Sequence, residues 1–261
     1  MKKTFHRENP PAQCIQLKIM VFQLCLVILF LFSQTGGNAE KVLDFSDDND
    51  WKPNNKSVYT HASLEKKDLP KSFTICAAFM VEFWTQETNA NLFTFLNAKK
   101  QWLALSLWSK ESETMLKINL SEDVVEVILS FLFFPLQWMN VCLSVNSATS
   151  TVALVVDSEE LLDKAMDMKD APAKMDLLLG WNGDREEYPG RVTGLNIFSS
   201  ALTLTRMKMV TEAGGDLCGA PGDFLSWDDS FDRFDLHSQA KPVEMEETPC
   251  QRRKKMHIYD L

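Results

Sequence analysis

The chain has 261 residues, of which 45% are hydrophobic and 24% are charged. This balance is typical of a globular protein and excludes a disordered or collagen-like chain. Lys and Arg together number 27 and Asp and Glu 36, so the formal net charge is −9. Because the recognition of phosphates needs clustered basic residues, this composition argues against nucleic acid or anionic lipid as the main partner.

The first 39 residues have the pattern of a secretory signal peptide. Basic residues precede an apolar run over residues 19–32, and the small residues Gly37 and Ala39 follow it. We predict cleavage after Ala39 and secretion. A spanning helix needs about 20 apolar residues, so no stable membrane span is expected. A type II membrane anchor is the alternative interpretation, and either Met1 or Met20 can serve as the start.

Four cysteines follow the predicted cleavage site: Cys76, Cys142, Cys218 and Cys250. An even number in an oxidising compartment predicts two disulfides, and three connectivities are open. None of the four has the C-x-x-C spacing that is typical of zinc or redox sites.

Two sequons follow the predicted cleavage site as well. They are Asn55-Lys56-Ser57 and Asn119-Leu120-Ser121. In a secreted chain this pattern predicts an N-linked glycan on each asparagine that is exposed, so Asn55 and Asn119 are the candidate glycosylation sites.

Most of the remaining chain alternates between apolar and polar residues, as β-strands do. The alternating segments lie at 73–83, 103–107, 152–156, 177–179 and 192–198, with Asn, Gly or Pro turns between them. Residues 124–134 form a nearly continuous apolar run, which predicts a strand buried on both faces and stopped by Pro135. Strand after strand with short turns predicts an all-β sandwich.

Two segments have helical patterns. Thr203 is a candidate N-cap of a short helix that runs to Ala213, before Gly214-Gly215. Residues 158–168 also have a helical period of their own, because one side of such a helix would carry Leu161, Leu162, Ala165 and Met168.

Five short motifs occur in the order and spacing of a known family. They are Phe73-Thr74-Ile75-Cys76, Leu107-Trp108-Ser109-Lys110, Trp138-Met139-Asn140-Val141-Cys142, Leu179-Gly180 and the segment 194–202. They resemble the pentraxin/laminin-G-like (concanavalin A-like) family, and the resemblance covers residues 41–213. The resemblance implies a two-sheet antiparallel jelly roll with one short C-terminal helix, and a hairpin instead of a helix at 158–168.

The resemblance also bears on the cysteines. It implies the single inter-strand bridge of the family between Cys76 and Cys142. Cys218 and Cys250 then remain for a second bridge outside the sandwich, or for a bridge to another chain.

Short pentraxins bind their ligands through calcium ions that carboxylates and amides of two loops hold. At the first loop the matching positions before Trp108 are Trp102 and Leu103, which cannot ligate calcium. At the second loop only Asp184 matches, with Asn182 nearby. Since calcium needs about six to eight oxygen ligands, we predict no resident cofactor and no metal ligands. Asn182 and Asp184 are the candidate ligand-binding residues, and calcium is the ion to test.

Two acidic clusters invite other predictions. Asp44, Ser46 and Asp48 have the spacing that opens an EF-hand loop, but the glycine and glutamate that such a loop needs are absent, so a solvated loop is the better interpretation. Residues 223–235 interleave aspartates with aromatic residues, which predicts a loop anchored on the sandwich by Phe224, Trp227, Phe231 and Phe234.

We therefore predict three segments: a signal peptide at 1–39, a jelly roll at 40–215, and a disulfide-closed connector with a polar tail at 216–261. Residues 222–227 resemble the connector of invertebrate secreted proteins in which a domain of this family precedes a C-type lectin-like domain. The last residues then resemble the beginning of a further domain. A basic processing site at 252–255 and a solvated tail are the alternatives, and we prefer the tail.

No Gly-x-Ser-x-Gly, His-Glu-x-x-His or paired-glutamate glycosidase motif occurs, so we predict no enzyme. The predicted function is a secreted recognition or adhesion domain that binds an extracellular glycan or protein. The alternatives are a structural spacer of a multidomain extracellular protein and a type II surface protein. The pentameric assembly of short pentraxins is not carried over from the fold.

Overall fold

The computed structural model describes residues 40–45, 61–67, 69–82, 89–97, 100–110, 113–129, 135–166, 175–180, 190–212, 221–237, 240–245 and 248–249. All of them belong to the second of two units into which the chain divides, residues 39–261. Within these described ranges, no helix is both long enough and apolar enough to cross a membrane.

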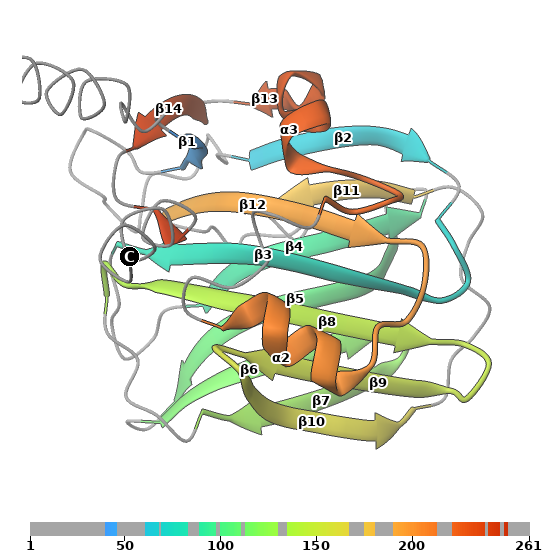
Figure 1. Ribbon diagram of the computed structural model, residues 1–261. Helices are drawn as coiled ribbons and strands as arrows, with labels where there is room; N and C mark the ends of the chain where they lie inside the picture. Colours follow the sequence, from blue (N-terminus) through green and yellow to red (C-terminus); the bar gives the residue numbers. More distant parts are fainter. Residues whose placement is uncertain are drawn as a thin grey trace, which may run out of the picture. The chain divides into compact units, whose positions relative to one another are not determined.

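The described unit is a sandwich of two seven-stranded antiparallel sheets, as predicted (Figure 1). Sheet A has the order β10 (Glu159–Ala165), β9 (Thr151–Val156), β8 (Trp138–Asn146), β3 (Phe73–Val81), β12 (Gly190–Phe198), β1 (Glu40–Asp44) and β14 (Lys241–Met245). Sheet B has the order β13 (Asp235–His237), β2 (His61–Lys67), β11 (Met175–Leu179), β4 (Asn89–Asn97), β5 (Lys100–Lys110), β6 (Glu113–Leu120) and β7 (Asp123–Ile128).

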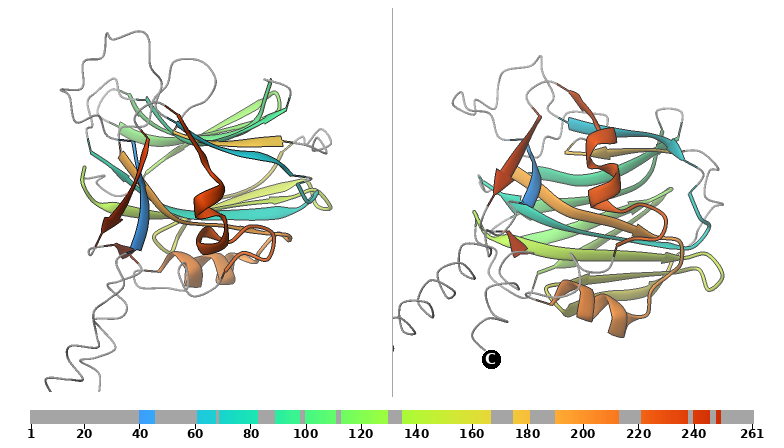
Figure 2. Two further views of the ribbon diagram at one scale, coloured as in Figure 1. Left: turned by 90° about the horizontal axis from the view of Figure 1, so that it is seen from above. Right: turned by 45° about the horizontal axis from the view of Figure 1, so that its top comes forward.

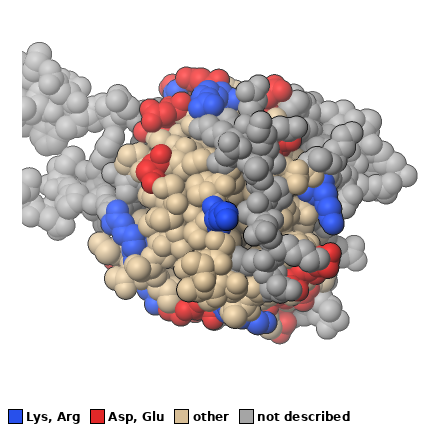
Figure 3. All heavy atoms as spheres, turned by 90° about the vertical axis from the view of Figure 1, so that its right-hand side faces the viewer, with Lys and Arg blue, Asp and Glu red and all other residues tan. Residues whose placement is uncertain are grey.

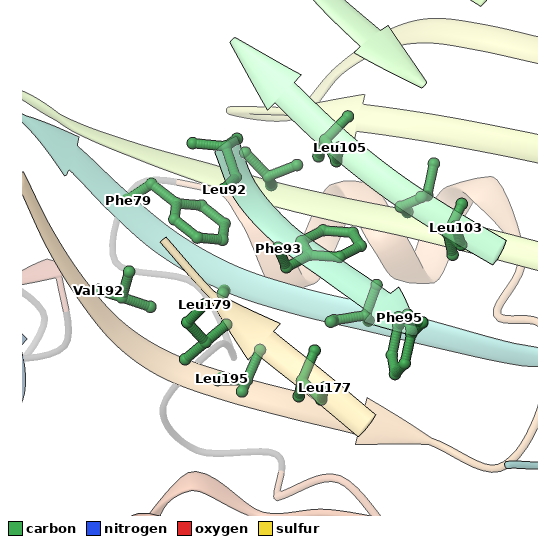
Figure 4. Close-up of a cluster of buried hydrophobic side chains, with 14 of the residues drawn as sticks. Phe79, Leu92, Phe93, Phe95, Leu103, Leu105, Leu177, Leu179, Val192 and Leu195 are labelled. Carbon is green, nitrogen blue, oxygen red and sulfur yellow. The ribbon is translucent and has the colours of Figure 1, made fainter. Parts of the chain in front are cut away.

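The core lies between the two sheets (Figure 4). Every second residue of β3 faces it, and the facing strands of sheet B supply Phe93, Phe95 and Leu105, which are at most 2% exposed. The rings of Phe73 and Phe95 meet edge to face with their centres 5.6 Å apart. Burial of aliphatic and aromatic side chains from both sheets is the main stabilising contribution to such a fold.

A helix, α2 (Leu204–Thr211), covers the outer face of sheet A (Figure 2). Thr203 caps it as predicted, because its hydroxyl accepts a hydrogen bond from the Arg206 N–H at 3.3 Å. The helix ends at Thr211, two residues before the predicted end. Beneath it Cys76 and Cys142 form a disulfide between directly opposed positions of β3 and β8.

Residues 158–168 do not form the helix that their own pattern predicts. They contribute β10, which makes a hairpin with β9, as the family resemblance implied. Asp157 and Ser158 reverse the chain with φ angles of 46° and 70°. The β10 register shifts between Glu160 and Leu162, so the adjacent side chains Leu161 and Leu162 both pack partly against the core. A bulge therefore produced the helix-like pattern.

The prediction of a fully buried strand at 124–134 is wrong for its described part. The strand is β7, which ends at Ile128 and lies at the edge of sheet B. Its residues alternate in burial, and Val124 and Ile128 are 55% and 56% exposed. A continuous apolar run here reflects the β-branched composition of an edge strand rather than burial on both faces. Residues 130–134 lie outside the described residues.

The segment after α2 packs on the sandwich through aromatic rings, which confirms that prediction. Trp227 in α3 (Trp227–Ser230) and Phe231 in η2 (Phe231–Arg233) have ring centres 5.0 Å apart, and both join the core. The indole N–H of Trp227 donates to Lys41 O at 3.0 Å. The chain then adds β13 to sheet B and β14 to sheet A, so this segment completes an edge of each sheet.

The first strand of the sandwich lies between later ones. β1 pairs with β12 on one side and with β14 on the other. The Glu40 carboxylate accepts hydrogen bonds from the Thr193 hydroxyl at 2.7 Å and from the Thr248 hydroxyl. These hydrogen bonds hold Glu40, the first described residue, in place in sheet A.

Trp227→Ala is expected to lower the free energy of unfolding by about 3–5 kcal/mol, because it empties a buried aromatic position. Trp227→Phe keeps most of the ring but removes the donor to Lys41 O, at a cost of about 1 kcal/mol. Met209→Ala, at a helix position that is 50% exposed, is the control and should stay within about 0.5 kcal/mol. Urea unfolding measures all three. Equal stabilities of Trp227→Ala and Met209→Ala would contradict the packing role of this segment.

Burial raises the pKa of Asp157 above its ordinary value, although hydrogen bonds from the backbone and side-chain N–H groups of Asn140, at 2.9 and 3.1 Å, lower it in part. The folded state therefore holds this proton at pH values where the unfolded chain has released it. The corresponding stability is complete below the unfolded pKa and is lost as the pH rises through the folded pKa.

Asp157→Asn removes the loss of stability at high pH, because the asparagine side chain does not ionise. Asparagine also suits the positive φ at this position. We expect the variant to have a higher Tm than the wild type at pH 7, and the two Tm values to converge as the pH falls below the ordinary pKa of an aspartate. Calorimetric scans across this range measure the difference. Asp163→Asn, at an exposed position of the same hairpin, is the control. A difference in Tm that does not change with pH would contradict the assignment.

Candidate functional site

The outer faces of the two sheets differ. Helix α2 lies on sheet A, whereas no helix of the described residues lies on the outer face of sheet B (Figure 2). Along β5, β6 and β7, side chains that face the core alternate with side chains that face outward. We use the name outer B face for the outward set: Trp108, Met115, Lys117, Asn119, Val124, Glu126 and Ile128.

The strand register arranges these side chains in rows. Trp108 is opposite Met115, which is opposite Ile128, and the next row contains Lys117 opposite Glu126. The Lys117 ammonium lies 5.3 Å from the centre of the Trp108 ring, within cation–π distance. An aromatic ring on a rigid strand can stack on a flat apolar surface of a ligand. The cation and the carboxylate beside the ring can hydrogen-bond the ligand's polar groups.

A buried polar cluster supports this face from β4 and β5. Asn91, Thr94 and Ser106 are at most 1% exposed. The Asn91 side-chain amide donates to the Thr94 hydroxyl at 2.9 Å, and its oxygen accepts from the Ser106 hydroxyl at 3.2 Å. This cluster was not predicted from the sequence, although three polar residues inside otherwise apolar strands are a detectable signal. Because its members satisfy one another, the cluster fixes the two strands rather than offering free ligand groups.

The segment that carries the candidate ligand-binding residues Asn182 and Asp184 lies outside the described residues. Its last described residue, Gly180, has a φ of 82° and donates its N–H to Leu92 O at 3.5 Å. Gly180 thus lies beside the first half of β4, at the end of sheet B where Asn89 is paired with Trp108. Asn55, Cys218 and Cys250 also lie outside the described residues, and Asn119 is half-buried on the outer B face.

The two described positions that match the first calcium loop of short pentraxins, Trp102 and Leu103, do not fit calcium. Trp102 and Leu103 are 7% and 0% exposed and belong to the core, and the Trp102 ring is centred 6.3 Å from that of Phe73. Neither side chain has an oxygen. Among the residues that the structure describes, no cluster of three or more His, Cys, Asp or Glu could hold a metal ion.

Charge is distributed without a basic stripe on the face in Figure 3. One Lys or Arg side chain lies near the centre of this view, surrounded by uncharged residues, and the described Lys and Arg side chains do not form a continuous stripe. Such a surface does not offer the clustered cations that bind a nucleic acid backbone.

One comparison with known proteins identifies a family, and another identifies structures with a similar fold. Residues 51–234 match the Pentaxin family. A search of the curated proteins found no match. Among solved structures, the native heptameric SAP-like pentraxin from Limulus polyphemus is similar with a TM-score of 0.67 and 14% identity, over 79% of this chain and 96% of that chain.

Two further structures are similar at lower scores. A candidate carbohydrate-binding protein from Bacteroides ovatus has a TM-score of 0.54 and 13% identity, over 80% of this chain and 61% of that chain. The full extracellular region of zebrafish Gpr126/Adgrg6 has a TM-score of 0.52 and 12% identity, over 82% of this chain and 27% of that chain. At these identities the likeness concerns the fold alone.

Calcium is expected to leave the Tm of this protein unchanged, because Trp102 and Leu103 supply no side-chain ligands. A native site at 100 times its Kd would add about 2.7 kcal/mol of stability, which thermal unfolding detects readily. Calorimetric titration of calcium into chelator-treated protein is the second measurement. A stabilisation that Asp184→Ala abolishes would overturn this expectation and assign the ion to the segment after Gly180.

Proposed function

The chain belongs to the pentaxin (pentraxin) family, and on this basis we propose that it is a secreted, non-enzymatic recognition domain. It binds an extracellular glycan or protein ligand, without the full calcium site of short pentraxins. Proteins of this family are typically lectin-like and non-enzymatic, and function in such sandwiches depends on surfaces rather than on the fold.

The outer B face is the observation that carries this proposal. Trp108 is half-buried, so its ring is held by the sheet and partly accessible. Lys117 lies over the ring and Glu126 is next to Lys117 in register. A sugar ring or a peptide side chain can stack on the indole while its polar groups reach the neighbouring charges. Asn182 and Asp184 are proposed to contribute from the segment that follows Gly180.

Secretion has independent support from the disulfide. Cys76 and Cys142 are 1% and 0% exposed, under α2, and disulfides of this kind are typical of extracellular proteins. The pentaxin family agrees with that location. We propose that residues 1–39 are the secretion signal, with cleavage after Ala39.

A structural spacer is the second candidate function. It is favoured by Trp102 and Leu103, which pack in the core where the resemblance places calcium ligands. A sandwich that lost its ligand site could still hold a neighbouring module in place. The two functions differ in whether the outer B face binds anything.

The test is a screen of the full chain, secreted from insect cells, on glycan and extracellular-protein arrays. We expect at least one ligand, and an at least tenfold weaker Kd, or about 1.4 kcal/mol, for Trp108→Ala and for Lys117→Gln. Met209→Ala, on α2 and therefore on the sheet A side, is the matched control and should bind as the wild type does.

Two results would count against the proposal. No binding by the wild type on either array would favour the spacer. Binding that Trp108→Ala and Lys117→Gln leave unchanged, with unchanged Tm, would place recognition away from the outer B face.

A further inference from the structure

The composition of the edge strand β7 makes it prone to pair with strands of other chains. Four of its six residues, in the sequence Asp123-Val-Val-Glu-Val-Ile128, are β-branched, and it contains neither proline nor lysine. In the described part of the chain it pairs with β6 alone. An edge of this kind is a template for pairing with another chain unless something covers it.

The exposed side of β7 is apolar at both ends. Val124 and Ile128 point outward and are 55% and 56% exposed, with Glu126 as the charged residue between them. On the inward side Val125 packs against the core. One carboxylate is weak protection for an outward side that is otherwise made of large β-branched residues.

The neighbouring strand places a sequon beside this side of β7. Ile118 and Leu120 of β6 are fully buried in the core, so Asn119 between them faces the outer B face, where it is half-buried. Its cross-strand partner is Val124. Directly opposed side chains in an antiparallel pair have Cβ atoms about 4.5–5.5 Å apart. A group attached to Asn119 therefore starts next to the exposed Val124.

We propose that Asn119 carries an N-linked glycan that lies over β7 and prevents the edge strand from pairing with other chains. The inference rests on the secreted location in the proposed function, because the oligosaccharide is transferred in the secretory pathway. There its bond to a lipid diphosphate carrier breaks, the bond to the Asn119 side-chain nitrogen forms, and the carrier and one amide proton are released. The glycan covers Val124 with hydrated polar surface and obstructs the approach of a second strand to the side of β7 on which no described strand pairs.

The glycan and the proposed ligand site share the outer B face, with Lys117 of the ligand site between Trp108 and Asn119. Trp108 is opposite Met115, four residues before Asn119 on the same strand. At about 3.3 Å per residue, the two lie roughly 13 Å apart along β6. The glycan occupies the Val124 end of the face and leaves the Trp108 end accessible.

Site occupancy is the first measurement. The full chain is recovered from the medium of insect cells and treated with peptide-N-glycosidase, which converts a glycosylated asparagine to aspartate. Peptide mass spectrometry should find that conversion at Asn119 in most of the material. Secreted protein with an unmodified Asn119 would overturn this inference and leave the proposed function intact. Retention of the chain inside the cells with reduced Cys76 and Cys142 would instead overturn the secretion on which both depend.

The protective role is tested by Asn119→Gln with Asn55→Gln as the matched control, since each removes one sequon. Light scattering during concentration and warming should show self-association of Asn119→Gln at a several-fold lower protein concentration than for the wild type. Asn55→Gln should match the wild type. Adding Val124→Lys to Asn119→Gln should restore the wild-type behaviour, because lysine on an edge strand opposes pairing.

Two outcomes would overturn the role. One is an Asn119→Gln protein that stays as dispersed as the wild type at every concentration. The other is self-association that Val124→Lys does not relieve although the double variant keeps the Tm of Asn119→Gln, since the associating surface would then lie elsewhere.

Discussion

The fold depends on burying both faces of one strand. All nine residues of β3 are buried, with Phe73 and Phe79 in the core between the sheets and Cys76 and Ala78 beneath α2. A strand in this position needs every polar group to be satisfied. Its hydroxyl residue, Thr74, donates to Ser200 O at 3.1 Å and accepts from the Leu202 N–H at 2.8 Å. The chain that leads from β12 into α2 is thereby tied to the centre of sheet A.

This arrangement makes the two sides of the sandwich unequal. The outer side of sheet A has a structural role, because α2 covers it and packs over the disulfide. Sheet B has an outward set of side chains that mixes an indole, an ammonium, a carboxylate and exposed valine and isoleucine. The buried Asn91, Thr94 and Ser106 cluster holds the strands beneath it in register. Rigidity on one side and chemical variety on the other is an arrangement suited to recognition.

The sequence predicts the strands and the helix correctly where the local pattern and the tertiary position agree. Period-two alternation identified β3, β9 and β12, and Thr203 marked the start of α2, because local hydrogen bonding and burial agree there. Predictions failed where tertiary position overrides pattern. The bulge at Glu160–Leu162 makes a strand look helical, and the composition of β7 does not reveal that it lies at an edge.

The candidate site was less predictable than the fold. Asn182 and Asp184 were predicted through their position after a family motif, and they stay a prediction because they lie outside the described residues. Lys117 and Glu126, by contrast, come together only through strand pairing that no local pattern specifies. The failure of Trp102 as a calcium ligand could be predicted, because indole and aliphatic side chains offer a hard cation no oxygen at any geometry.

The contacts of β1 have a consequence for how the protein is made. Glu40 is held by Thr193 and Thr248, which lie 153 and 208 residues further along the chain. During synthesis the first strand therefore leaves the ribosome long before either neighbour exists, and sheet A cannot close until the last strand has been translated. Such non-local pairing is slow and leaves apolar strands uncovered in the meantime. Sheet A is therefore complete only once β14, the last strand of the described residues, has been translated, and the earlier strands have to be kept from aggregating until then.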